Sequence, residues 1–187
     1  LNSGSVDVLN RADIRTSGTI SPGLLAQSIG GGGGYAGGMD AETISLGTNG
    51  RSSTNSGNVV VKNSGTIITS GRGSGALLAQ SIAGGGGFLS SDVIDSMFMG
   101  SNYTLSSKSG SVEVVNSGLL STEGAGSIAL LAQSVGGGGG VNAYSQLDED
   151  LSEQDSLSLI NAFTKSNYRL FLSSNQAFNS GAENILV

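Results

Sequence analysis

The stretch LLAQSIGGGGG occupies residues 24–34, and it recurs as LLAQSIAGGGG from Leu77 and as LLAQSVGGGGG from Leu130. The spacing is constant, because 77 − 24 and 130 − 77 both equal 53. A similar lead-in sequence precedes each copy and starts at a glycine of the same phase, namely Gly4, Gly57 and Gly110. A fixed period of this size is typical of stacked supersecondary units rather than of independent domains.

Each copy predicts three short strands separated by turns. The first covers Val6 to Leu9, Val59 to Lys62 and Val112 to Val115; the second lies at Ile14, Ile67–Ile68 and Leu119–Leu120; the third covers Leu24 to Ile29, Leu77 to Ile82 and Leu130 to Val135. Gly, Ser, Thr and Asn interrupt the apolar runs, and no 3.6-residue period is sustained. Helices are therefore not expected in the repeats.

The fold class that this pattern predicts is all-β, a right-handed parallel β-helix (β-solenoid) built from 53-residue repeats. A propeller or a sandwich is the alternative, but both need longer antiparallel strands than these glycine-punctuated segments offer. We expect two or three coils of the solenoid in each repeat, so that one repeat advances the stack by roughly 10 to 15 Å.

Residues at one phase of the repeat are expected to form columns along the stack. Three such sets are candidate structural ladders: Asn10, Asn63 and Asn116; Gln27, Gln80 and Gln133; and Leu25, Leu78 and Leu131. Side-chain amides stacked in this way can hydrogen-bond along the axis, as in other cross-β ladders. Intervening coils are expected to keep the columns sparse.

The period divides the chain into repeat 1 (residues 1–56), repeat 2 (57–109) and the conserved part of repeat 3 (110–140). Residues 141–180 form a spacer 18 residues longer than the 22-residue spacers at 35–56 and 88–109. This enlarged segment contains the acidic run DEDLSEQD at 148–155, followed by SLSLINAF, which predicts a short helix. Residues 181–187 are interpreted as the start of a further repeat.

Composition excludes several kinds of function. The 187 residues include 32 glycines, one proline, no cysteine and no histidine, and the net charge is −6. The eight Lys and Arg residues are scattered, so no phosphate-tracking surface for nucleic acid is expected. Thiol and zinc-finger chemistry are excluded by the absence of cysteine. No stretch of about 18 apolar residues predicts a transmembrane helix.

No catalytic, cofactor-binding or metal-binding residues are predicted, and we expect no enzyme. The glycine tracts lack the GK[ST] of a phosphate loop, and they lead to Tyr35, Phe88 and Val141 instead of the aspartate of calcium-binding nonapeptides. Asp7 and Glu113 share a phase, but Val60 lies between them. The alternatives are a β-helical polysaccharide-processing enzyme fragment with its site outside the repeats, and a non-adhesive filament subunit.

The repeated LLAQSIGGGGG, preceded by NSGTI at residues 63–67, resembles the passenger repeats of large autotransporter adhesins of Gram-negative bacteria. The match covers 4–34, 57–87 and 110–140. The resemblance implies a secreted structural or adhesive segment displayed at the cell surface, with its outer-membrane anchor elsewhere in a longer protein. The implied partners are a host or neighbouring-cell surface, matrix or glycan, with self-association as a further possibility. Because the chain opens within a repeat, we expect the parent protein to be longer.

Overall fold

The computed structural model describes residues 2–37, 41–47, 51–52, 54–91, 94–99, 103–104, 107–137, 140–144, 169–171 and 185–186. The regular structure of these residues is entirely β-strand, arranged in successive sets that we call layers. Layer 1 contains β1 (Val6–Asn10), β2 (Ile14–Thr16), β3 (Leu24–Ile29), β4 (Gly34–Gly37), β5 (Ala41–Leu46) and β6 (Arg51–Ser52). Layer 2 contains β7 (Val59–Asn63), β8 (Ile67–Thr69), β9 (Leu77–Ile82), β10 (Gly87–Ser91), β11 (Ile94–Met99) and β12 (Tyr103–Thr104). Layer 3 contains β13 (Val112–Asn116), β14 (Leu120–Thr122), β15 (Leu130–Val135), β16 (Gly140–Tyr144) and β17 (Arg169–Phe171), and β18 (Ile185–Leu186) begins a fourth layer.

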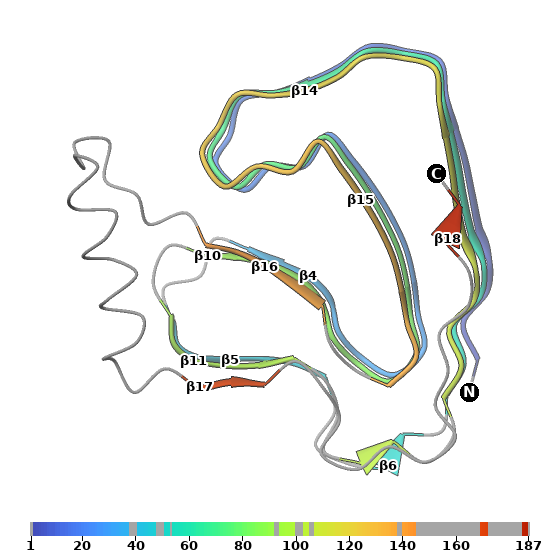
Figure 1. Cartoon of the computed structure of the whole chain (residues 1–187), viewed down its shortest axis with the longest axis vertical. Coiled ribbons are helices and arrows are strands. Elements are labelled where there is room, and N and C mark those ends of the chain that lie inside the picture. The colour runs from blue at the N-terminus through green and yellow to red at the C-terminus, as the bar shows by residue number, and fades with distance from the viewer. Residues whose placement is uncertain are drawn as a thin grey trace.

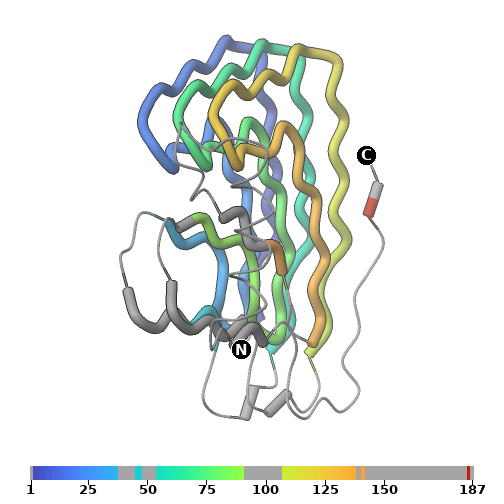
Figure 2. The backbone as a smooth tube through the Cα atoms, turned by 60° about the vertical axis from the view of Figure 1, so that its left-hand side comes forward, coloured from blue at the N-terminus to red at the C-terminus, as the bar shows by residue number. Residues whose placement is uncertain are grey.

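Equivalent strands of successive layers pair in parallel and in register. The sheets are β1-β7-β13-β18, β2-β8-β14, β3-β9-β15, β4-β10-β16, β5-β11-β17 and β6-β12. Val6 pairs with Val59 and Val59 with Val112, so the partners are 53 residues apart. The layers superimpose when viewed along the stack (Figure 1), and they run side by side when the view is turned (Figure 2). The prediction of an all-β chain with parallel strands is confirmed for the described residues.

Each 53-residue repeat forms one layer, so the prediction of two or three coils per repeat is wrong. Leu24 pairs directly with Leu77, and Leu77 with Leu130, with no strand between them. The spacers supply the remaining strands of the circuit, from β4 to β6 and from β10 to β12. The advance per repeat is therefore about 4.8 Å, the spacing of one strand from the next. The columns are continuous rather than sparse.

Two apolar compartments lie on opposite sides of the β3-β9-β15 sheet, which runs through the middle of each layer (Figure 1). Leu77 points into the first compartment, where it packs with Val59 and Ile67. Its neighbour Leu78 points into the second and packs with Phe88. Successive side chains of a strand point to opposite faces. The two leucines of the LLAQSI motif therefore serve two different cores.

The glycine tracts allow the backbone to pass close to the next layer. Gly87 has a positive φ of 137°, and a Cβ built on it would lie 2.0 Å from the carbonyl oxygen of Gly34, its partner in register. A side chain at this position would therefore meet both an unfavourable backbone conformation and a steric clash. This geometry explains the repeated glycines without any bound ligand.

The enlarged spacer interrupts the period at one place. β16 still pairs with β10 at the usual offset, since 140 − 87 = 53. β17 and β18 pair at a larger offset, since 169 − 96 and 185 − 112 both equal 73. The extra residues thus number 20 rather than 18, and they lie between Tyr144 and Arg169. The acidic run 148–155 and the SLSLINAF segment, with its predicted helix, lie outside the described residues.

Candidate functional site

The three asparagines predicted to form a ladder are hydrogen-bonded to one another. Asn10 Nδ2 donates to Asn63 Oδ1 at 2.7 Å, and Asn63 Nδ2 donates to Asn116 Oδ1 at 2.7 Å. Each Nδ2 also donates to the carbonyl oxygen two residues further along its own chain, for example from Asn63 to Gly65 at 2.9 Å. Each asparagine therefore closes a turn within its layer and links that layer to the next.

The three glutamines form a second ladder, on the side of the central sheet that faces the second compartment. Gln27 Nε2 donates to Gln80 Oε1, and Gln80 Nε2 donates to Gln133 Oε1. Gln80 is fully buried, so these hydrogen bonds satisfy an amide that has no access to water. In both ladders the nitrogen of one layer donates to the oxygen of the following layer. The stack therefore has a direction.

The leucine set Leu25, Leu78 and Leu131 lies in register, one residue before the small side chains of the AQS motif. Leu78 is fully buried in the second compartment, and Leu131 packs against the same cluster. Leu25, in the first layer, is 38% exposed. The structure thus gives the three leucines equivalent places and different degrees of burial.

A serine network connects the lead-in sequence to the third strand, and the sequence reasoning did not select it as a site. Ser56 Oγ and Ser81 Oγ are hydrogen-bonded at 2.7 Å, and Ser81 Oγ donates to the Gly57 carbonyl oxygen at 2.9 Å. The Gly110 N–H of the next layer donates to Ser81 Oγ at 2.9 Å. The signal for this network was the constant serine directly before each lead-in glycine. These hydroxyls therefore join strands within a layer as well as between layers.

Tyr35 and Phe88 stack in register where the glycine tract enters β4 and β10. Their ring centroids are 5.4 Å apart and the ring planes differ by 7°. Tyr35 Oη donates to the Ile20 carbonyl oxygen at 3.1 Å. Burial raises the pKa of Tyr35 to about 12, because the phenolate would lose hydration. The pair closes one side of the second compartment.

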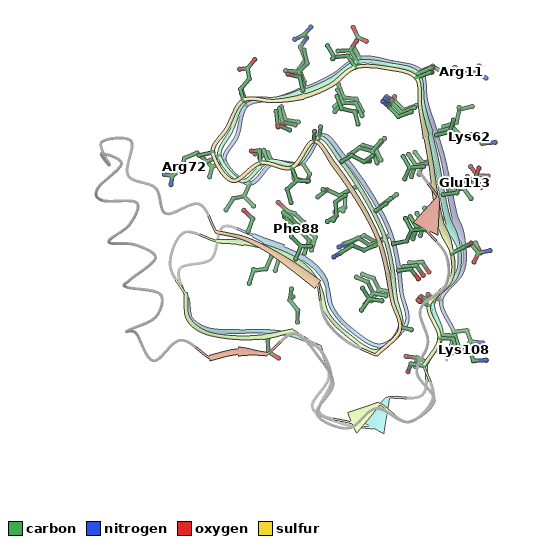
Figure 3. The ribbon with its side chains drawn as sticks, viewed as in Figure 1. Arg11, Lys62, Arg72, Phe88, Lys108 and Glu113 are labelled. Atoms are coloured by element: carbon green, nitrogen blue, oxygen red, sulfur yellow. The ribbon has the colours of Figure 1, made fainter. Side chains whose placement is uncertain are left out.

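Charged side chains lie mainly on the outer face of the β1-β7-β13-β18 sheet, where Figure 3 shows Arg11, Lys62 and Glu113 pointing away from the core. Asp7, Val60 and Glu113 occupy one column in register. A shallow hollow elsewhere on the surface is lined by Arg15, Thr16, Ser17, Ile68, Ser70 and Glu123. In the part of the chain that the structure describes, no group of three His, Cys, Asp or Glu side chains could hold a metal ion. Within the same residues there is no helix long and apolar enough to cross a membrane.

Comparisons with protein-family models, with curated proteins and with solved structures each found no match. The resemblance to autotransporter passenger repeats therefore remains a prediction from the sequence motif. The observations from which a function can be inferred are the ladders, the stacked layers and the position of the inserted residues.

Proposed function

We propose that the chain is a structural and adhesive segment of a secreted bacterial cell-surface repeat protein, folded as a right-handed parallel β-helix with one 53-residue repeat per turn. The observation that carries this proposal is the unbroken parallel register between layers, from β1 through β7 to β13 and in the other sheets. A stack of this kind makes the position of each layer depend on its neighbours. Such a scaffold suits a spine that holds binding segments away from a cell.

The ladders support a mechanical role because they cross every layer boundary of the described stack. Asparagine and glutamine amides contribute hydrogen bonds of about 1 kcal/mol each to stability, and the two apolar compartments run alongside them. The same residues are used at each layer, so the spine lengthens by repetition and needs no new packing solution.

The inserted segment is the proposed adhesive element, since it is the one departure from the period between the described strands. Residues 145–168 contain five of the 14 Asp and Glu residues of the chain. The proposed partners are a host or neighbouring-cell surface, matrix or glycan. Display at the cell surface, through an anchor in another part of the parent protein, follows from the motif resemblance and belongs to the same proposal.

A deletion that restores the period tests this function. Removal of residues 145–164 leaves two residues between Tyr144 and position 167, as in layer 2, where two residues separate Ser91 from Ile94. The purified chain and this variant would be coated on beads and offered to cells, matrix proteins and glycans. We expect the full chain to bind and the variant to lose binding while keeping its β-type circular dichroism.

Two results would contradict the adhesive proposal. The first is equal binding by the full chain and by the deletion variant, which would remove the inserted segment from adhesion. The second is sustained product release from a polysaccharide, abolished by Asp148→Asn or Glu149→Gln, which would make the chain a glycan-processing enzyme. A charge-neutral change on the outer sheet face, Lys62→Met, serves as the surface control in both assays.

A further inference from the structure

The stack has two faces at which strands of the described residues lack partners on one side. The lower face is the side of layer 1 directed away from layer 2, and the upper face is the side of layer 3 directed away from layer 2. Each sheet begins with its layer 1 strand, and the sheets of β14, β15 and β16 end with those strands. Only Val112 and Glu113 of β13 are covered, by β18. Unpaired strand edges are templates for further pairing.

The backbone groups at the two faces are complementary. Leu24 N–H donates to the Ala76 carbonyl oxygen at 2.9 Å, and Leu77 N–H donates to the Ala129 carbonyl oxygen at 3.1 Å. By the same geometry the N–H of Leu130 is directed out of the upper face. The carbonyl oxygen of Gly23, which is equivalent to Ala76, is directed out of the lower face. The N–H groups of one face therefore match the carbonyl groups of the other.

The amide ladders continue this complementarity in the side chains. Gln80 donates upward to Gln133, so Gln133 presents its own Nε2 on the upper face, while Gln27 presents Oε1 on the lower face. The asparagine ladder has the same direction, with the second Nδ2 hydrogen of Asn116 at the upper face and Asn10 Oδ1 at the lower face. The two faces thus fit head to tail, whereas two identical faces would oppose like groups.

We propose that the upper face of one chain binds the lower face of a second copy, so that layers continue from chain to chain. The occupant is a second copy because the contact would repeat the one by which the chain's own layers already pack. This inference rests on the structural part of the proposed function and needs no receptor. A head-to-tail contact between different surfaces does not close on itself, so it generates an open series of oligomers rather than a dimer.

The short strand β18 competes with the incoming copy. Ile185 pairs with Val112, the place that Val6 of a second copy would take by analogy with Val6 and Val59. Association therefore requires the displacement of a two-residue strand, which lowers the apparent affinity by the fraction of chains in which it is bound. A chain that ends after Gly181 is expected to associate more tightly than the full chain.

The variant Gln133→Glu tests the contact directly. A glutamate at this position still accepts the hydrogen bond from Gln80, but it removes the upward donor and places a carboxylate opposite Gln27 Oε1 of the next chain. Lys62→Gln is the matched control, because it changes the net charge by the same amount at an exposed position of the middle layer. Sedimentation equilibrium would measure association, and electron microscopy would show its geometry.

For the unmodified chain we expect a concentration-dependent series of dimers, trimers and longer rods. Gln133→Glu should raise the dissociation constant at least about tenfold, and Lys62→Gln should leave it unchanged. Mixing the Gln133→Glu chain with a Gln27→Lys chain should restore association between the two, because a lysine on the lower face can donate to the new carboxylate.

Three results would overturn the proposal: an unmodified chain that stays monomeric up to about 1 mM, a closed dimer, or equal weakening by Gln133→Glu and Lys62→Gln. The first two do not depend on whether any variant folds. Loss of cell binding with intact assembly would refute the adhesive function alone, and intact cell binding without assembly would refute this inference alone.

Discussion

The middle layer and the outer layers carry the same motif in different surroundings. All six residues of LLAQSI in β9 are buried, whereas β3 alternates between buried and exposed positions and β15 is half-buried throughout. Leu78 is 0% exposed and Leu25 is 38% exposed, although each is the second leucine of its motif. Burial is therefore a property of the stack, as expected where stability is the sum of repeat and neighbour terms.

The largest difference between layers is expected from the second leucine. Leu78→Ala should lower the free energy of unfolding by about 3 kcal/mol, since it leaves a cavity in a closed core, and Leu25→Ala by less than about 1 kcal/mol. Urea denaturation followed by circular dichroism measures both. Equal losses would show that the outer layer is as well packed as the middle one.

The lead-in glycines offer a comparison at one phase. A Cβ on Gly57 would lie 2.5 Å from the carbonyl carbon of Gly4, while a Cβ on Gly4 would have nothing within 4 Å. Gly57→Ala should therefore cost about 2 kcal/mol through steric strain, and Gly4→Ala close to nothing. Similar denaturation midpoints for the two variants would mean that the layers are further apart than the structure shows.

The glutamine ladder should lose more from its middle member than from its last. Gln80 donates one hydrogen bond and accepts another, whereas Gln133 only accepts within the chain. Gln80→Met is expected to cost about 1.5 kcal/mol and Gln133→Met about half as much. Thermal unfolding of the two variants beside the unmodified chain would reveal the order, and a reversed order would contradict the ladder.

The smallest expected effect is a pH dependence at the first layer. The folded-state pKa of Tyr35 is raised to about 12 from an ordinary value of 10, so the unfolded chain loses this proton first as the pH rises. Its contribution to stability is thus complete below pH 10 and is lost as the pH rises toward 12. Urea midpoints of the unmodified chain and of Tyr35→Phe should diverge in this window, and parallel curves would argue against burial of the hydroxyl.

The constant spacing was sufficient to predict the strands of the conserved half of each repeat and the columns of asparagine, glutamine and leucine. It was not sufficient to count layers, because a period of 53 residues is compatible with any whole number of coils. The spacers hid β4 to β6, since their sequences vary and Gly34 was interpreted as part of a corner. The size of the insertion was 2 residues too small because Gly181 was aligned with the lead-in glycines, whereas pairing places Ile185 beside Val112.

A pair of nitroxide labels at Leu9→Cys and Lys62→Cys would test most directly whether one repeat forms one layer. Both positions are exposed, they pair in register, and the chain has no other cysteine. One layer per repeat predicts backbones about 5 Å apart, with strong dipolar broadening of the electron paramagnetic resonance spectrum, and weaker broadening for labels at Leu9 and Val115, about 10 Å apart. Broadening for Leu9 and Lys62 no stronger than that for Leu9 and Val115 would contradict the stacked register.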